Sequence, residues 1–110
     1  MILTVDHKDY ELALTTRGAL QLEERLKRNP INVLLKIKTM EELPSLNDTM
    51  IIFHAMLQKY HHGMSMDAAM DLFDKYMAEG GDVIQLIEII VKVFEESGLI
   101  KFEEDEKNFQ

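Results

Sequence analysis

Residues 82–98, DVIQLIEIIVKVFEESG, constrain the fold of this chain more than any other stretch. Nine of the twelve positions from Val83 to Phe94 are apolar. The three polar exceptions are Gln85, Glu88 and Lys92. On a helix these exceptions lie at i, i+3 and i+7, so they form one narrow polar stripe. Asp82 is a suitable N-cap and Gly98 a suitable left-handed C-cap, so the stretch predicts one well-bounded helix.

A helix this apolar must be covered on nearly all sides. At 110 residues the chain is expected to form one domain with a modest core. The helix is therefore predicted to be the central core helix, or to have part of its surface covered by a second subunit. The apolar content of 46% is ordinary for a globular protein and too high for a disordered one.

Charge is unevenly distributed along the sequence. Residues 1–38 carry seven lysines and arginines against five acidic residues, a balance of +2, and residues 39–110 carry five against fifteen, a balance of −10. An acidic body of this kind does not favour nucleic-acid binding. It is typical of a solvated surface that keeps a protein soluble, and it also allows like subunits to meet head to tail.

The N-terminus shows no signal peptide, and no apolar run approaches the roughly 20 residues that span a bilayer. A soluble protein without membrane contact is expected. There is no cysteine, so a disulfide framework and cysteine-based sites are excluded.

Two β-like runs, Ile2–Val5 and residues 10–14, flank a polar link of four residues and predict a hairpin whose Tyr10, Leu12 and Leu14 pack on helices. A helix follows from an N-cap at Thr16 to Arg28. Residues 31–40 are compatible with either a short helix or an extended run.

The next helix is expected from about Leu46 to His61, with Ser45 or Asn47 as N-cap. Its predicted heptad-like core seam comprises Leu46, Met50, Phe53, Leu57 and Tyr60. Another helix is expected from about Met66 to Ala78, where glycines end it. Its predicted core face comprises Met66, Ala69, Met70, Phe73, Tyr76 and Met77.

These patterns predict a mainly α fold of the α+β type. A small N-terminal β-hairpin precedes about four helices packed as a compact antiparallel bundle. A single domain is expected over residues 1–102, followed by an acidic, flexible tail over residues 103–110.

Candidate chemical groups do not assemble into a recognisable site. His61 and His62 point about 100° apart on a regular helix, so they do not chelate one ion together, and zinc needs three or four ligands. Asp67, Asp71 and Asp74 share one helical face and are expected to be solvated. Motifs for nucleotide binding, hydrolase nucleophiles and metalloproteases are absent from the sequence. An enzyme is therefore not expected, nor any metal or cofactor.

Eight methionines suit adaptable apolar surfaces. Met50, Met70 and Met77 are expected in the core, and Met56 and Met64 in an exposed patch. The candidate partner-binding residues are Met56, Met64, Ile90, Leu99, Ile100 and Phe102.

An ordered set of short segments carries a family resemblance. The segments are YEL at 10–12, TTRGA at 15–19, NPINVL at 29–34, LPSLND at 43–48, FHAMLQ at 53–58, LFDKY at 72–76 and SGLI at 97–100. In this order and spacing, over about residues 1–102, the chain resembles the tail assembly chaperones of tailed phages and prophages of Gram-positive bacteria.

The resemblance implies a protein of the host cytoplasm that is not part of the mature virion. It implies binding to the tape measure protein, which it keeps soluble, and help in recruiting tail tube subunits. A homo-oligomer would fit such a coat along a long partner. The alternative is a small helical adaptor or regulatory protein of a prophage with no chaperone role.

Overall fold

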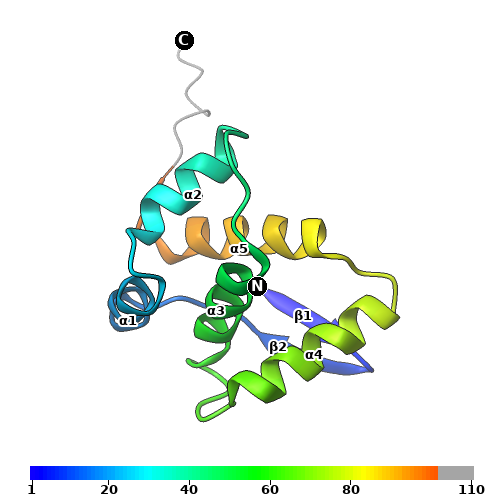
Figure 1. The fold of residues 1–110 in the computed structure, drawn as a ribbon. Coiled ribbons are helices and arrows are strands. Elements are labelled where there is room, and N and C mark those ends of the chain that lie inside the picture. The colour runs from blue at the N-terminus through cyan, green and yellow to red at the C-terminus, as the bar shows by residue number, and fades with distance from the viewer. Residues whose placement is uncertain (102–110) are drawn as a thin grey trace.

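The computed structural model describes residues 1–101, so Phe102 and the acidic tail expected over 103–110 lie outside the described part of the chain. Within residues 1–101 a two-stranded antiparallel hairpin precedes five helices, as Figure 1 shows. The expected class, mainly α with a small N-terminal hairpin, is confirmed. There are five helices where about four were expected, because most of residues 31–40, whose conformation the sequence left open, is helical.

The hairpin consists of β1 (Ile2–Val5) and β2 (Lys8–Glu11). Asp6 and His7 form its two-residue turn, with φ angles of 54° and 63°. Two-residue turns with positive φ match the twist of the flanking strands, and aspartate and histidine tolerate that conformation better than most residues. The prediction of a four-residue link and a second strand starting at Tyr10 was wrong, because the turn needs only two residues.

The chain after β2 is held against the body of the protein. The Leu12 N–H donates to the Met1 carbonyl at 2.8 Å, and the Ala13 N–H donates to the Met56 carbonyl at 3.0 Å. Leu12 and Leu14 are buried in the core, as their alternation with polar residues predicted.

The first two helices are α1 (Thr16–Leu26) and α2 (Pro30–Lys38). The Thr15 hydroxyl caps α1 by accepting from the Gly18 N–H, so the N-cap lies one residue before the expected Thr16. Asn29 caps α2 through its side-chain oxygen, and proline occupies the first helical position. Proline is well suited to that position, since its missing N–H would be unpaired there in any case.

Serine caps begin the next two helices, α3 (Leu46–Leu57) after Ser45 and α4 (Met66–Ala78) after Ser65. The bounds of α4 agree with the prediction. The α3 helix ends before the expected His61, and residues 58–63 form turns.

The long apolar stretch forms α5 (Val83–Ser97). The Asp82 carboxylate accepts from the Gln85 N–H at 2.8 Å, and Gly98 ends the helix with φ of 80°. Both predicted caps are confirmed. The predicted polar stripe of α5 is exposed along its length.

Helix α3 organises the core because it contacts α1, α4 and α5. Its buried positions lie on more than one face, and they are Asp48, Thr49, Met50, Ile52, Phe53, Met56 and Leu57. The heptad-like seam is wrong at both ends. Leu46, the first residue of α3, and Tyr60, which follows its end, are both exposed.

The buried face of α4 differs from the predicted one. Leu72 is buried beside Ala69 and Phe73, whereas Met70 and Met77 are 40% and 41% exposed. Since α4 packs on α3 and β1, its inward face is turned toward Leu72. The two methionines therefore lie at the edge of the solvent-facing side, and the expectation that they fill the core was wrong.

Candidate functional site

Two of the expected partner-binding residues belong to the core. Met56 is 0% and Ile90 is 1% exposed, so neither reaches a partner. Met56 was expected on the surface because α3 was predicted to bury one seam, but the helix is buried on more than one face. Ile90 lies on the inward side of α5 and packs in the same cluster as Met56.

Met64 is partly buried against the core. Its carbonyl accepts from His54 Nε2 at 2.8 Å and from Gln58 Nε2 at 3.1 Å. These contacts hold the start of the α4 segment against α3. Met64 is thus part of a structural junction, with only part of its side chain on the surface.

Leu99 and Ile100 also pack partly against the core, and Phe102 lies outside residues 1–101. Leu99 borders an apolar groove of about 170 Å³ between α1, the start of α2 and the end of α5. We name it the Leu20 groove, after its most exposed apolar residue, which is 63% accessible. Its apolar lining consists of Ala19, Leu20, Pro30, Ile31, Phe94 and Leu99.

A second and larger groove of about 340 Å³ runs between α2 and α5. Its apolar floor, which defines the α2–α5 groove, consists of Ile37, Ile87 and Val91. Two cations and two anions form the rim, namely Lys38, Glu88, Lys92 and Glu95. Lys38 Nζ lies 3.5 Å from Glu95 Oε2, so one ion pair bridges the two helices at this groove.

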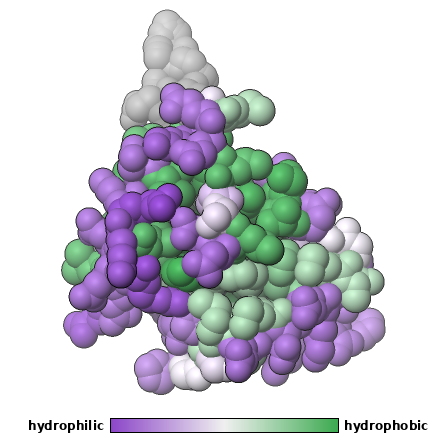
Figure 2. All heavy atoms as spheres, viewed as in Figure 1, coloured by the Kyte–Doolittle hydropathy of each residue, from purple (hydrophilic) through white to green (hydrophobic). Residues whose placement is uncertain are grey.

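The α2–α5 groove continues onto exposed apolar surface. Ile84 lies one turn before Ile87 and is 48% exposed. Figure 2 shows hydrophobic residues gathered over the first half of α5 and paler, moderately hydrophobic ones across α4, with hydrophilic residues toward the edges. This face is the most extended apolar surface in that view.

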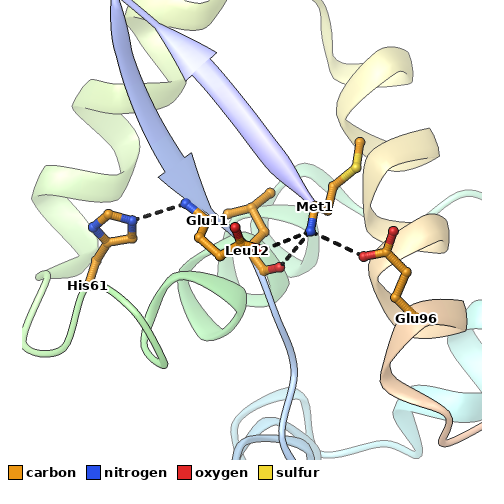
Figure 3. Close-up of polar contacts among 5 residues, drawn as sticks. All are labelled: Met1, Glu11, Leu12, His61 and Glu96. Atoms are coloured by element: carbon orange, nitrogen blue, oxygen red, sulfur yellow. Dashed lines mark hydrogen bonds and ion pairs between the residues drawn. The ribbon is translucent and has the colours of Figure 1, made fainter.

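A polar cluster joins the hairpin to α5 (Figure 3). The Met1 ammonium lies 2.9 Å from Glu11 Oε2 and 3.2 Å from Glu96 Oε1, and 3.5 Å from the Leu12 carbonyl. The hydrogen bond to Glu11, with further help from Glu96, raises the pKa of the amine against the opposing effect of its burial. The cluster holds the start of β1 on the last turns of α5, which is a structural role.

Two histidines, His61 and His54, make hydrogen bonds within the fold. His61 Nε2 accepts from the Glu11 N–H at 3.2 Å, also visible in Figure 3. His54 Nδ1 lies 3.0 Å from Arg25 Nη1. A guanidinium only donates, so His54 Nδ1 accepts. Nε2 is therefore protonated, and its N–H donates to the Met64 carbonyl. Among residues 1–101 no three histidine or acidic side chains are grouped to hold a metal ion.

Asp67, Asp71 and Asp74 are all exposed on α4. Tyr76, on the opposite side of this helix, donates its hydroxyl hydrogen to Gln85 Oε1 at 3.2 Å. Burial raises the pKa of Tyr76, with Asp82 and Glu88 acting in the same direction. The contact joins α4 to α5 across the Gly80-Gly81 link.

Sequence reasoning missed the α2–α5 groove because the conformation of residues 31–40 was left open. The signal was present in Asn29-Pro30, which is a good helix start as well as a stop for the preceding helix. A helix from Pro30 places Ile37 on the side that faces α5.

None of the helices in the described part of the chain is both long and apolar enough to cross a bilayer. Comparison with curated proteins and with solved structures gave no match. A protein-family comparison matched residues 2–108, nearly the whole chain. On that match, the chain belongs to the family described as Family of unknown function (DUF6096).

Proposed function

We propose that this protein is a tail assembly chaperone of a tailed phage or prophage. It binds the tape measure protein in the host cytoplasm, keeps it soluble and helps recruit tail tube subunits, and it is absent from the mature virion. The ordered segments from residue 10 to residue 100 support the proposal through their resemblance to that group of proteins.

The proposal rests chiefly on the α2–α5 groove. An amphipathic helix docks by placing apolar side chains, spaced three or four residues apart, into such a groove. The floor of Ile37, Ile87 and Val91 offers the apolar contact, and Ile84 extends it by one turn along α5. A rim with two charges of each sign accommodates a partner whose polar face is mixed in charge.

The rest of the surface suits a chaperone role. A long helical protein with an unpaired apolar stripe tends to aggregate, and covering the stripe removes that tendency. The chain has a net charge of −8, which adds repulsion between complexes and favours their solubility.

Co-expression with the tape measure protein encoded in the same gene neighbourhood tests the proposal. The wild-type chain is expected to bring the tape measure protein into the soluble fraction and to co-purify with it. Ile37→Asp and Ile84→Asp place a charge at the groove and are expected to lose the complex. Tyr60→Asp, at an exposed ring outside the groove, is the matched control and should retain it.

A tape measure protein that is equally soluble alone, with no complex recovered, would refute the chaperone role. That outcome would favour the small helical adaptor instead. Loss of the complex by Tyr60→Asp as strongly as by Ile84→Asp would show that the α2–α5 groove is not the specific binding site.

A further inference from the structure

A pocket of about 290 Å³ lies between the turn that follows α1, helix α2, the first turn of α3 and the link that joins these last two helices (Figure 1). It shares no lining residue with the α2–α5 groove. We name it the Asp48 pocket, after the buried carboxylate in its wall. Its charged lining consists of Arg28, Lys36, Glu42 and Asp48.

Asp48 is only 8% exposed, yet its carboxylate accepts no hydrogen bond from the residues that the structure describes. Its one contact there is an ion pair in which Arg28 Nη1 lies 3.5 Å from Oδ2, too far for a good hydrogen bond. A buried carboxylate is costly unless it is both paired and hydrogen-bonded. The Asp48 carboxylate therefore has unused acceptor capacity at the wall of the pocket.

The other charges of the pocket are held loosely. The Arg28 side chain is 58% exposed, so its contact with Asp48 is open to solvent on one side. Lys36 Nζ lies 3.4 Å from Glu42 Oε1, and these two side chains are 44% and 63% exposed. The lining thus carries two positive and two negative charges. A ligand with one charge of each sign leaves this balance unchanged.

The remaining lining suits a small molecule with an apolar part. Val33, Leu43 and Pro44 contribute apolar surface, and Leu43 is 54% exposed. Asn32 contributes an amide, which both donates and accepts hydrogen bonds. A volume of about 290 Å³ lies at the lower end of the range for ligand pockets, so a molecule of amino-acid size fits best.

We propose that the Asp48 pocket binds a small zwitterion, namely a free amino acid with an apolar side chain. The ammonium group donates to Asp48 and supplies the hydrogen bonds that its carboxylate lacks. The ligand carboxylate accepts from Arg28 and Lys36, and such charge-assisted hydrogen bonds are the strong ones. The apolar side chain contacts Val33 and Leu43.

Both charged groups are needed on one molecule. An ammonium group alone would lie near two cations without an anion to compensate them, and a carboxylate alone would leave Asp48 without a donor. Leucine and two analogues test this requirement. 3-Methylbutylamine is leucine without its carboxylate, and 4-methylpentanoate is leucine without its ammonium group.

NMR titration of the full ¹⁵N-labelled chain is the measurement. Leucine is expected to give saturable shifts at the amide signals of Asn32, Leu43 and Asp48, and to raise Tm because it binds only the folded state. Each analogue lacks one set of hydrogen bonds to charged groups and should bind at least about tenfold more weakly.

Two variants with matched controls locate the site. Asp48→Asn keeps the shape of the side chain and removes its charge, and Asp67→Asn makes the same change in the first turn of α4, where the residue is exposed. Arg28→Gln removes the cation, and Arg17→Gln does so at an exposed residue that does not line the pocket.

Asp48→Asn and Arg28→Gln should each weaken leucine binding at least about tenfold, whereas both controls should bind like the wild type. Circular dichroism checks that each variant folds. If Asp48→Asn does not fold, Arg28→Gln decides, because the Arg28 side chain is largely exposed.

The absence of saturable shifts with leucine would overturn the proposal and leave Asp48 hydrated by water alone. Equal binding of leucine and either analogue would overturn the zwitterion. Binding that both pocket variants leave unchanged would place the ligand elsewhere. None of these results depends on the tape measure protein, so this proposal and the chaperone role fail separately.

Discussion

Replacing Ile90 by alanine, with Ile84→Ala as its matched control, tests whether α5 is oriented as described. The two residues have the same side chain and lie on the same helix. Ile90 is 1% exposed and Ile84 is 48% exposed. Any difference between the two variants therefore reports burial, with side-chain chemistry and helix propensity held constant.

The magnitude follows from the atoms removed. Each substitution deletes three carbons, worth about 0.8 kcal/mol each when fully buried, or about 2.4 kcal/mol for Ile90. The cavity left in a packed core raises the loss to about 3–4 kcal/mol. At Ile84, which is about half exposed, only about half of this burial free energy is lost, and no closed cavity forms. The higher helix propensity of alanine returns up to about 0.7 kcal/mol, so the net loss there stays below about 1 kcal/mol.

Urea unfolding followed by circular dichroism measures both values. A domain of this size typically has about 5–15 kcal/mol of stability, so Ile90→Ala should remain folded but lower the midpoint strongly at unchanged slope. Ile84→Ala should stay close to the wild type. Similar losses for the two variants, or a loss below about 1 kcal/mol at Ile90, would refute the assignment of Ile90 to the core and return it to the candidate interface.

Three further predictions concern the polar contacts and the α4–α5 link. Because the pKa of the Met1 amine is raised above its ordinary value of 8.0, its stabilising contribution should be complete below about pH 8 and decline as the pH rises through the raised pKa. Glu11→Gln should flatten that alkaline decline in urea unfolding, and a decline of unchanged size would contradict the assignment. His61→Phe removes the acceptor of the Glu11 N–H and should cost about 1–3 kcal/mol, with thermal unfolding as the check, whereas a neutral effect would count against the bond. Gly81→Ala places a Cβ against the Tyr76 ring and should lower Tm, while an unchanged Tm would show that the ring moves freely.

Helix starts and ends were the most predictable features of the fold. Asp82 and Gly98 bound α5 as expected, and Ser45 caps α3, because capping depends on a hydrogen bond formed within a few residues. Helix α2, whose stretch the sequence left open, obeys the same local rule through Asn29 and Pro30. It was left open because periodicity over so short a run does not separate a helix from an extended segment.

The candidate site was predictable only in part. Leu99 was expected to contact a partner and does border a groove, whereas Met56 is fully enclosed. The charge asymmetry that suggested head-to-tail contact is visible in the sequence. The α2–α5 groove is not, since its floor combines residues more than 45 positions apart, such as Ile37 and Val91.

The sequence by itself determined approximately where four of the five helices in residues 1–101 run, that the chain is mainly α with an N-terminal hairpin, and which residues form the polar stripe of α5. Tertiary structure alone decided which apolar residues are covered. Periodicity identifies an apolar face of a helix, but the breadth of the covered face depends on how many neighbours surround that helix. Helix α3 contacts three other helices, and its own Met56 is fully buried. Met70 and Met77 of α4, in contrast, stay partly exposed.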